Sequence, residues 1–421
     1  MHIQRLLNHT HPIKGWRYTT ARLSDKRGHE VIEVEVEHFA RRLPICSVCQ
    51  QPGRVYDHGS GEPRRFQFVP LWNMAVVLLY VMRRVNCTTC RRVVVEQVPW
   101  ACGKSRTTFA LLGFLATWAK RMSWKEVATS FGVGWDTVYR AVEWAVDYGR
   151  KHVDLSGITA IGVDEIAVGK GHRYLTVVYQ IDSGCRRLLW LGNERKEATL
   201  EEFFAWFGKA RTDALRFVCS DMWRPYLNVI ARHARNALNI LDRFHIVSNL
   251  GKAVDEVRRK EITDLRAKGT DAVLVKTRWI LLKKPRNLTS KQRRRRTDLL
   301  SYNLRSVRAY LLRLDFEHLW RFQLPIRAGQ FLDDWCRRAM RSRLEPFKKL
   351  ANTFRSHREL ILNYFHAKKA FSSGVVEGLN NKAKLGLRRG FGFKGERTRE
   401  IALFHYLGKL PEPPVTHRFA G

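Results

Sequence analysis

The sequences ITAIGVD at residues 158–164 and LRFVCSD at residues 215–221 indicate the fold class of the central part of this chain. Each is a short, mainly apolar run that ends on an aspartate, as a buried strand does when it reaches the edge of a sheet. Working outward, the pattern predicts strands at 158–164, 173–181 and 186–191, a helix at 199–209, a strand at 215–220, a helix at 225–234 and a strand at 238–241.

Three strands followed by helix, strand, helix and strand is the order of a ribonuclease-H-like α/β core. In such a sheet the first and fourth strands are neighbours, so we expect Asp164 and Asp221 to meet. Two buried carboxylates repel each other, and a hard divalent cation relieves that repulsion. The sequence therefore predicts a site for two Mg²⁺ ions, which would activate a water or a 3′-hydroxyl and stabilise the leaving 3′ oxygen.

A third acid has to come from a later helix, and Glu377 supplies it. On a helix, Glu377, Asn381, Lys384 and Arg388 are spaced so that they share one face. That face, with the neighbouring Arg389, would offer an acid to metal and polar or basic groups to DNA. The alternative is an ordinary solvated, charged face.

Asp242 and His245 form a Dx₂H step directly after the strand at 238–241. One interpretation places this acid and imidazole near the metal site as accessory residues, or uses them to fix a nearby loop. The alternative is a histidine whose role is purely structural, and the residues alone leave both open.

Two CxxC pairs, Cys46 with Cys49 and Cys87 with Cys90, predict one zinc site. Two residues between thiolates let one turn place both sulfurs on an ion, and two such turns complete a tetrahedron. The 37 residues between the pairs exceed the usual spacing of about 15–20, and a pair of longer strands would accommodate them. Four thiolates leave no open position for water, so the Zn²⁺ is expected to be structural, in a zinc ribbon. The alternative is four unrelated buried thiols.

Residues 122–140 fit a helix-turn-helix. Ser123 would cap the first helix with Glu126 as its capping-box partner, and Gly132 would supply the turn. The second helix, predicted at 135–146, would be the recognition helix. Its residues predicted to contact DNA are Trp135, Asp136, Thr137 and Arg140. The alternative is an ordinary αα-hairpin.

The charge of the chain indicates a polyanionic partner. Of 421 residues, 76 are Lys or Arg and 39 are Asp or Glu, which gives a net charge of +37. Nucleic acid is the usual partner of such a field, although a ribosomal protein or an anionic-membrane binder shares this charge. The 45% of hydrophobic residues excludes a disordered basic tail. Residues 1–20 show no secretory signal and the CxxC pairs indicate a reducing compartment, so we expect a cytoplasmic protein.

Three further stretches complete the predicted secondary structure. Residues 1–45 are expected to be β-like, because residues 31–37 alternate at period two. The longest apolar run, at 69–82, is shorter than the roughly 20 residues of a membrane helix and is predicted to be a buried strand. Residues 251–350 are expected to be helical, and their 27 basic and 11 acidic residues give a net charge of +16. This segment would hold the DNA backbone.

In this order, these motifs resemble the ISL-three family of insertion-sequence transposases, which belongs to the DDE superfamily. The resemblance spans about residues 42–407 and rests on the four-cysteine ribbon, the helix-turn-helix at 124–140 and the segment at 162–165. It continues through residues 220–223, 242–245 and 373–380. Each motif alone is weak, but the whole set is highly specific.

The resemblance implies that Asp164, Asp221 and Glu377 form a metal-binding catalytic triad for DNA cleavage and strand transfer, with Mg²⁺ that Mn²⁺ can replace. Several DDE families share a Dx₂H step, which favours accessory roles for Asp242 and His245. The 156 residues from Asp221 to Glu377 imply a mostly helical insertion. Transposases act as paired protomers, so a homodimer on double-stranded DNA is expected, with terminal inverted repeats and target DNA as partners and no membrane.

The predicted fold class is α+β multidomain. Its segments are an N-terminal β region with a four-cysteine zinc-binding domain at 1–103, a helix-turn-helix domain at 104–153, the first part of the catalytic core at 154–250, a basic helical insertion at 251–369, the last core helix at 370–408 and a tail at 409–421. The predicted function is that of a bacterial DNA transposase, nucleoid-associated when bound to DNA. One rival is a non-catalytic zinc and helix-turn-helix DNA-binding regulator, such as a domesticated transposase, against which the three acids argue. A ribosomal-type RNA-binding protein would explain the charge but not the aspartates at strand ends.

Overall fold

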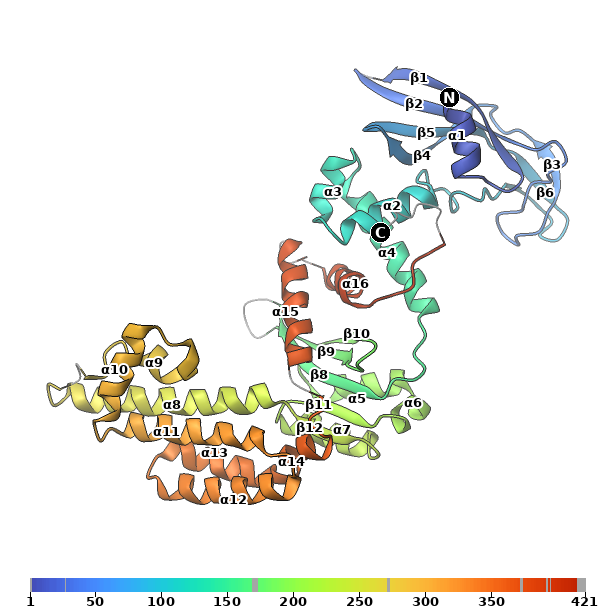
Figure 1. Ribbon diagram of the computed structural model, residues 1–421. Coiled ribbons are helices and arrows are strands. Elements are labelled where there is room, and N and C mark those ends of the chain that lie inside the picture. The colour runs from blue at the N-terminus through green and yellow to red at the C-terminus, as the bar shows by residue number, and fades with distance from the viewer. Residues whose placement is uncertain are drawn as a thin grey trace. The chain divides into compact units, whose positions relative to one another are not determined.

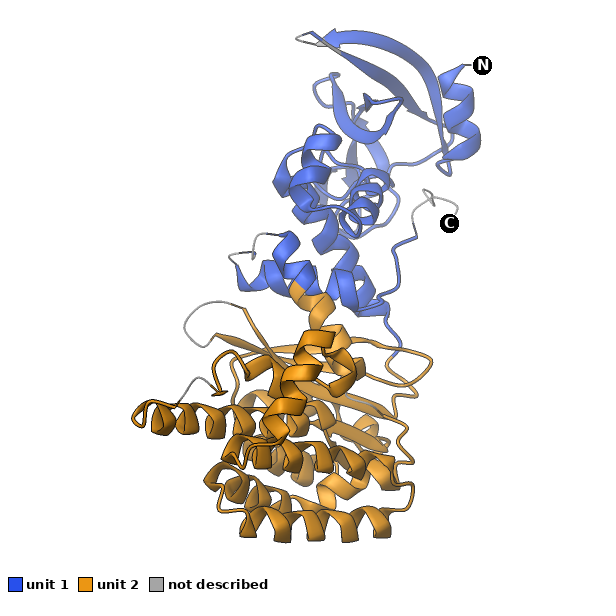
Figure 2. Cartoon of the chain, turned by 60° about the vertical axis from the view of Figure 1, so that its left-hand side comes forward, with its two compact units in different colours: residues 1–154, 385–421 blue, residues 155–384 orange. Residues whose placement is uncertain are grey.

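The computed structural model describes residues 2–26, 28–168, 173–270, 273–371, 374–390, 393 and 395–414. These form two compact units (Figure 2): unit 1 is Met1–Asp154 with Leu385–Gly421, and unit 2 is Leu155–Lys384. Ser373, the first residue of the last family motif, and residues 415–421 of the predicted tail lie outside the described residues. The division into six segments stays a prediction.

Unit 1 begins with a helix and a mixed four-stranded sheet (Figure 1). The helix is α1 (Ile3–Thr10), and the sheet order is β1 (Trp16–Lys26), β2 (His29–His38), β5 (Met74–Val81) and β4 (Pro63–Leu71). The prediction of β structure throughout 1–45 is wrong for α1. Leu7 is buried there, and the Asn8 side chain both donates to the backbone oxygen of Tyr18 at 2.8 Å and accepts from its N–H at 3.0 Å. These contacts with the first strand stabilise a helix that the period-two pattern further along does not reveal.

The apolar run at 69–82 forms a β-hairpin, so the prediction of one buried strand is wrong. Trp72 and Asn73 have φ angles of 50° and 64°, and Leu71 pairs with Met74 across the turn. Two consecutive residues with positive φ reverse the chain with the twist that antiparallel strands prefer. Trp72 lies in the turn and is 69% exposed although it is apolar, so the apolar pattern of the sequence does not reveal that the chain reverses there.

A buried ion pair joins the four-stranded sheet to the cysteine segment. Arg83 follows β5 and Glu96 follows β7 (Arg92–Val95), and their side chains are 2% and 0% exposed. Arg83 Nη2 lies 2.7 Å from Glu96 Oε2. The Tyr80 hydroxyl and the Arg83 N–H also donate to Glu96 Oε1, at 2.7 and 2.8 Å. The carboxylate therefore has the additional hydrogen bonds that a buried pair requires.

Helices complete unit 1: α2 (Phe109–Ala119), α3 (Trp124–Ser130), α4 (Trp135–His152) and α16 (Glu396–Leu407). The predicted capping box is confirmed, because Ser123 Oγ accepts from the Glu126 N–H at 3.2 Å and the Glu126 carboxylate accepts from the Ser123 N–H at 2.7 Å. Gly132 has a φ of 61°, which allows the turn between α3 and α4. Arg150 of α4 donates to Glu400 of α16 at 2.5 Å.

Unit 2 is built on a five-stranded sheet in the order β10 (Arg187–Asn193), β9 (Tyr174–Gln180), β8 (Ala160–Ala167), β11 (Phe217–Ser220) and β12 (Leu238–Leu241). The first three strands are antiparallel, whereas β8, β11 and β12 are parallel. The helices between the strands are α5 (Glu197–Phe207), α6 (Lys209–Asp213) and α7 (Arg224–His233). Phe203, Phe207 and Val229 of these helices are fully buried with Ile161 and Val218 of the sheet. The predicted order of strands and helices is confirmed.

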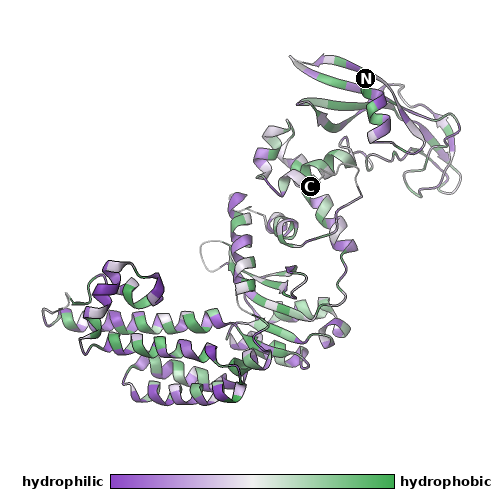
Figure 3. Ribbon diagram, in the orientation of Figure 1, coloured by the Kyte–Doolittle hydropathy of each residue, from purple (hydrophilic) through white to green (hydrophobic). Residues whose placement is uncertain are grey.

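The remainder of unit 2 is helical, which confirms the prediction for 251–350. Its elements are α8 (Arg243–Arg266), α9 (Arg278–Leu282), η2 (Pro285–Asn287), α10 (Ser290–Leu300), α11 (Arg305–Phe316), η3 (Glu317–Arg321), α12 (Pro325–Arg341), α13 (Glu345–Ser356), α14 (Arg358–His366) and the part of α15 (Gly374–Arg389) up to Lys384. These helices alternate hydrophilic and hydrophobic stripes (Figure 3). The apolar sides meet around Trp335, Phe347 and Phe354, which are fully buried. Of the helices described, none combines the length and apolar character needed to cross a bilayer.

Replacing Glu96 with alanine leaves Arg83 buried without its counter-charge, so we expect the N-terminal sheet to lose about 3–5 kcal/mol of stability. Thermal unfolding and hydrogen exchange of β5 would measure the loss. The matched control is Glu37→Ala, which breaks an exposed ion pair with Arg17 and should cost about 0–1 kcal/mol. Equal losses in the two variants would contradict a special role for the buried pair.

Candidate active site and cysteine cluster

Three aspartates lie at one edge of the unit 2 sheet, where its parallel strands end. Asp164 lies inside β8, and the prediction that this strand ends at Asp164 is wrong, because pairing with β9 continues it to Ala167. Asp221 directly follows β11 and Asp242 directly follows β12. The register of the two parallel pairs makes Asp221 level with Asp164 on one side and with Asp242 on the other. This register and the effect of the Asp221 charge on the pKa of Asp164 support the predicted proximity of Asp164 and Asp221, and Asp242 lies beside Asp221.

The carboxylate of Asp164 is held from two sides. Its Oδ1 accepts from the Glu165 N–H at 2.8 Å, and its Oδ2 accepts from the side-chain amide of Asn380 at 2.6 Å. Asn380 is buried, and its own oxygen accepts from the Tyr179 hydroxyl at 2.8 Å. Burial and the nearby charge of Asp221 raise the pKa of Asp164, because both disfavour the ionised form. A cation at this position would be favoured for the same reason.

Asp242 and His245 lie beside Asp164. Asp242 is the N-cap of α8, where its Oδ1 accepts from the Phe244 N–H at 2.6 Å, and His245 follows in the first turn. His245 Nε2 lies 3.9 Å from Asp164 Oδ1 and 3.8 Å from Asp242 Oδ2. One ligand atom from each of the three residues lies within 4.8 Å of the others, so they could share a metal ion. The structure thus places the Dx₂H step, which the sequence left open, at the acidic edge.

An arginine bridges the other side of this edge. Arg195 follows β10, donates from Nη2 to Asp221 Oδ2 at 3.0 Å, and places Nε 2.7 Å from Glu165 Oε1. Its guanidinium also lies over the ring of Trp223, 4.4 Å from the centroid. Burial and the nearby Asp221 raise the pKa of Glu165 to about 8. Arg195 therefore offsets part of the repulsion among acids that burial brings together.

Sequence reasoning missed Glu165, Arg195 and Asn380 as members of this group. Glu165 adjoins Asp164 in a strand, where neighbouring side chains normally point to opposite faces. Arg195 stands in a loop with no motif around it. Asn380 follows Glu377 by three residues, a spacing that brings two side chains together on a helix and could have pointed to it.

Helix α15, which carries Glu377, packs on β8. The Cβ that an alanine would have at Gly162 would lie 2.5 Å from Val376 Cγ2, so only glycine permits this approach. Asn380, one helical turn after Val376, holds Asp164 as described above. Glycine in the strand and asparagine on the helix thus fix the position of α15 against the acidic edge.

Glu377 itself is half-buried on α15. Within the described ranges, the close group of metal-ligating side chains at this edge consists of Asp164, Asp242 and His245. It includes neither Glu377 nor Asp221. The structure therefore brings Asp164 and Asp221 to one edge and the helix of Glu377 onto the same strand. The role of Glu377 as the third acid stays a prediction.

The residues predicted to contact DNA lie at the surface of their helices. Exposed side chains are Trp135, Asp136 and Arg140 on α4 and Asn381, Lys384, Arg388 and Arg389 on α15, whereas Thr137 of α4 is half-buried. On α4, the Trp135 ring stacks on Tyr139 with their centroids 5.8 Å apart and an interplanar angle of 13°. Arg140 Nε donates to the Asp136 backbone oxygen at 3.3 Å. The exposed side chains are available to a ligand.

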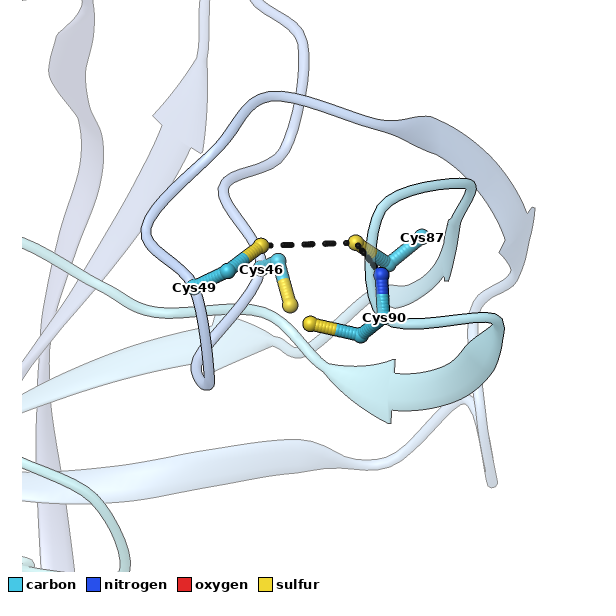
Figure 4. Close-up of side chains that lie close together, drawn as sticks. All are labelled: Cys46, Cys49, Cys87 and Cys90. Carbon is cyan, nitrogen blue, oxygen red and sulfur yellow. Dashed lines mark hydrogen bonds between the residues drawn. The ribbon is translucent and has the colours of Figure 1, made fainter.

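The four predicted zinc ligands lie together in unit 1 (Figure 4). Cys46 and Cys49 precede β3 (Arg54–Asp57), Cys87 ends β6 (Arg84–Cys87), and Cys90 lies in the turn before β7. Their sulfurs lie within 4.8 Å of one another, with Cys49 Sγ 3.5 Å from Cys87 Sγ. The Cys90 N–H donates to Cys87 Sγ at 3.4 Å and lowers the pKa of that thiol to about 7. Four converging sulfurs, one of them readily ionised, suit a tetrahedral metal ion.

Comparison with known proteins identifies the family. The family model of the ISL-three transposases, described as "Transposase", matches residues 161–399, which include every acid of the sheet edge and Glu377. The chain belongs to the ISL-three transposase family. It is 30% identical to the transposase for insertion sequence element IS1001 of Bordetella parapertussis over 352 residues, 83% of this chain and 86% of that protein. It is also 30% identical to the transposase for insertion sequence element IS1557 of Mycobacterium tuberculosis over 403 residues, 89% of this chain and 88% of that protein. The resemblance seen in the motifs is thus confirmed.

Replacing Gly162 with alanine should push α15 away from β8, because the new Cβ would lie 2.5 Å from Val376 Cγ2. Such overpacking should lower the free energy of unfolding of unit 2 by about 1–3 kcal/mol, which urea denaturation of unit 2 would measure. Adding Val376→Ala removes the clashing methyl groups, so the double variant should be more stable than the sum of the single losses. Strictly additive losses in this cycle would show that the two residues do not press on each other.

Proposed function

We propose that this chain is a bacterial insertion-sequence transposase that binds the terminal inverted repeats of its element and cuts and rejoins DNA. In this proposal Asp164, Asp221 and Glu377 form the metal-binding triad. The observation that carries it is the parallel register of β8 and β11, which brings Asp221, directly after β11, together with Asp164 of β8. That meeting falls within the region that matches the transposase family model.

The proposed core is ribonuclease-H-like. Three antiparallel strands followed by two parallel strands, with helices between them, support this assignment. The proposal treats the helical part from α8 to α14 as an insertion between the fifth strand and α15. Such an insertion separates Glu377 from the other acids in sequence, while α15 packs against β8.

The acids at this edge fit Mg²⁺, with Mn²⁺ as a substitute, because carboxylate oxygens are the ligands that such hard cations prefer. The raised pKa of Asp164, caused by burial and by Asp221, supports the fit, since a bound cation would favour the ionised form. Mg²⁺ held by Asp164, Asp221 and Glu377, in a two-ion site, would polarise the scissile phosphodiester and make the attacking oxygen more nucleophilic.

Other residues of the chain would hold these groups in place. Asn380 fixes Asp164 Oδ2 by a hydrogen bond of 2.6 Å, while Oδ1 accepts from the Glu165 N–H and lies 3.9 Å from His245 Nε2. His245, whose Nε2 lies 3.9 Å from Asp164 Oδ1 and 3.8 Å from Asp242 Oδ2, would help to orient these two carboxylates. Arg195 would keep Asp221 oriented through its bond of 3.0 Å. These residues position the acids, so their loss should weaken cleavage without abolishing DNA binding.

DNA recognition is proposed for α3 and α4 as a helix-turn-helix together with the cysteine cluster as a structural zinc ribbon. The exposed Trp135, Asp136 and Arg140 at the start of α4 support the first assignment, with the half-buried Thr137 between them. Asn381, Lys384, Arg388 and Arg389 on α15 would contact phosphates. A homodimer would hold two ends of the element, and the protein would be cytoplasmic and associated with the nucleoid through DNA.

The second candidate is a non-catalytic DNA-binding regulator derived from a transposase. One feature favours it: Arg195 already engages Asp221, and Glu377 lies outside the close group around Asp164 in the described residues. Such a protein would keep the DNA-binding modules and bind the repeats without cutting them. Cleavage and binding must therefore be measured separately.

Labelled DNA carrying the ends of the element, incubated with Mg²⁺ or EDTA, tests the proposal. We expect metal-dependent nicking at the repeat boundary, reduced about 10²–10³-fold in Asp221→Asn and Glu377→Gln, because a metal ion contributes several kcal/mol to the barrier. The control is Glu202→Gln, an exposed acid of the same unit, which should cleave normally. Repeat-specific binding with no cleavage under any divalent ion would establish the regulator instead.

Elemental analysis should find one Zn²⁺ per chain, and Cys87→Ser should lose it. Because metal binding and local folding are coupled, we expect this variant to lose hydrogen-exchange protection in β3, β6 and β7 and to bind DNA ends more weakly. Cys102→Ser is the matched control, since Cys102 is exposed and outside the cluster. Full protection of these strands after zinc removal would contradict a structural role for the metal.

A further inference from the structure

The helical part of unit 2 contains an open cleft of about 1190 Å³ that is rich in cations. Its walls come from the start of α8, from η2, α11 and η3, and from the end of α12 and the residues that follow it. Eight arginine and lysine side chains line it, against two acids. The cleft therefore has a strong excess of positive charge, and no residue of the proposed triad lies in it.

Both acids of the cleft are already paired. Asp315 lies 2.6 Å from Arg338, and Glu317 lies 3.7 Å from Arg313. Elsewhere in the lining, exposed cations make no side-chain hydrogen bond or ion pair within the described part of the chain: Lys284, Arg286, Arg308, Arg321, Arg341 and Arg343. Since like charges repel when gathered in one hollow, such a set is stabilised by a ligand that carries several negative charges.

The cleft begins next to the acidic edge. Arg243 lines it and directly follows Asp242, and both residues also line a smaller hollow below the ends of β11 and β12. The Arg243 guanidinium lies over the Trp320 ring, 5.0 Å from its centroid, and this contact fixes its position in the lining of the cleft. A chain of phosphates that reaches Asp242 could thus continue past Arg243 into the cleft.

We infer that this cleft binds the sugar-phosphate backbone of a DNA duplex without reading its sequence. Arginine forks match phosphate oxygens, and phosphate contacts carry no base information. Proteins that hold single strands stack bases on exposed aromatic rings, whereas Trp320 is buried under Arg243 and the lining offers no exposed Phe, Tyr or Trp among the described residues. With the proposed function, the ligand is the DNA that continues from the reacting bond.

The test measures binding of the full chain to a labelled duplex that lacks terminal repeats, over a series of salt concentrations. The cleft variant takes one arginine from each of three elements, Arg286→Gln, Arg308→Gln and Arg341→Gln. The control variant removes the same charge from exposed sites of the same unit outside the cleft, Arg235→Gln, Arg294→Gln and Arg327→Gln. The steepness of log affinity against log salt should fall by about 2–3 in the cleft variant, since each phosphate contact contributes about 0.9. In the control variant, this slope should change by less than the contribution of one phosphate contact.

Equal changes in the two variants, or none in either, would overturn the inference, because the long-range field and not the cleft would then govern binding. The inference would also be overturned if the cleft variant lost more affinity for a labelled single strand than for the duplex. A second variant, Lys284→Gln with Arg321→Gln, repeats the test on other walls if the first is misfolded. Because this test measures binding and not cleavage, a wild-type chain that shows the expected salt dependence but does not cleave labelled ends would refute the proposed function alone.

Discussion

Parallel pairing of β11 with both β8 and β12 is the constraint on which unit 2 depends. Parallel strands end at the same edge of a sheet, and here each of the three carries or is followed at once by an aspartate. The pairing therefore concentrates negative charge in a partly buried place, where it is costly. Arg195 offsets part of this repulsion by an ion pair with Asp221, and Asn380 stabilises Asp164 by a hydrogen bond. A divalent cation would offset the remaining repulsion among the carboxylates.

The same edge organises the helical part. Asp242 is at once an acid of the edge and the N-cap of α8, so the helical part starts from the site. Arg243, the next residue, leads into the basic cleft. After α14 the chain returns as α15, which Gly162 admits close to β8 and Asn380 ties to Asp164. The helices thus form an extension of the acidic edge that is suited to hold a long polyanion beside it.

In unit 1 a different constraint acts, because the two CxxC pairs enclose a large stretch of chain. The 37 residues between them contain β3 and the long hairpin of β4 and β5, which accounts for the spacing. The buried pair of Arg83 and Glu96 links the end of that hairpin to the end of the cysteine segment. The sulfur cluster and the ion pair therefore hold the same two parts of the chain together, at separate points.

Features that depend on near neighbours along the chain could be predicted from the amino-acid sequence. The order of strands and helices around Asp164 and Asp221, the capping box of Ser123, the CxxC pairs and the helical character of residues 251–350 all follow from short patterns, although β8 continues past Asp164 to Ala167. Features that join segments distant in sequence become visible only in the folded chain. They are the placement of Asp242 and His245 beside Asp164, the ion pairs of Arg195, the close packing of α15 on Gly162 and the cationic cleft. Charges and hydrogen bonds act through space, so a residue such as Arg195 has no signature in its own stretch of sequence. Helix α1 could not be predicted for the same reason, because Tyr18, the residue that Asn8 of this helix contacts, lies in the following strand.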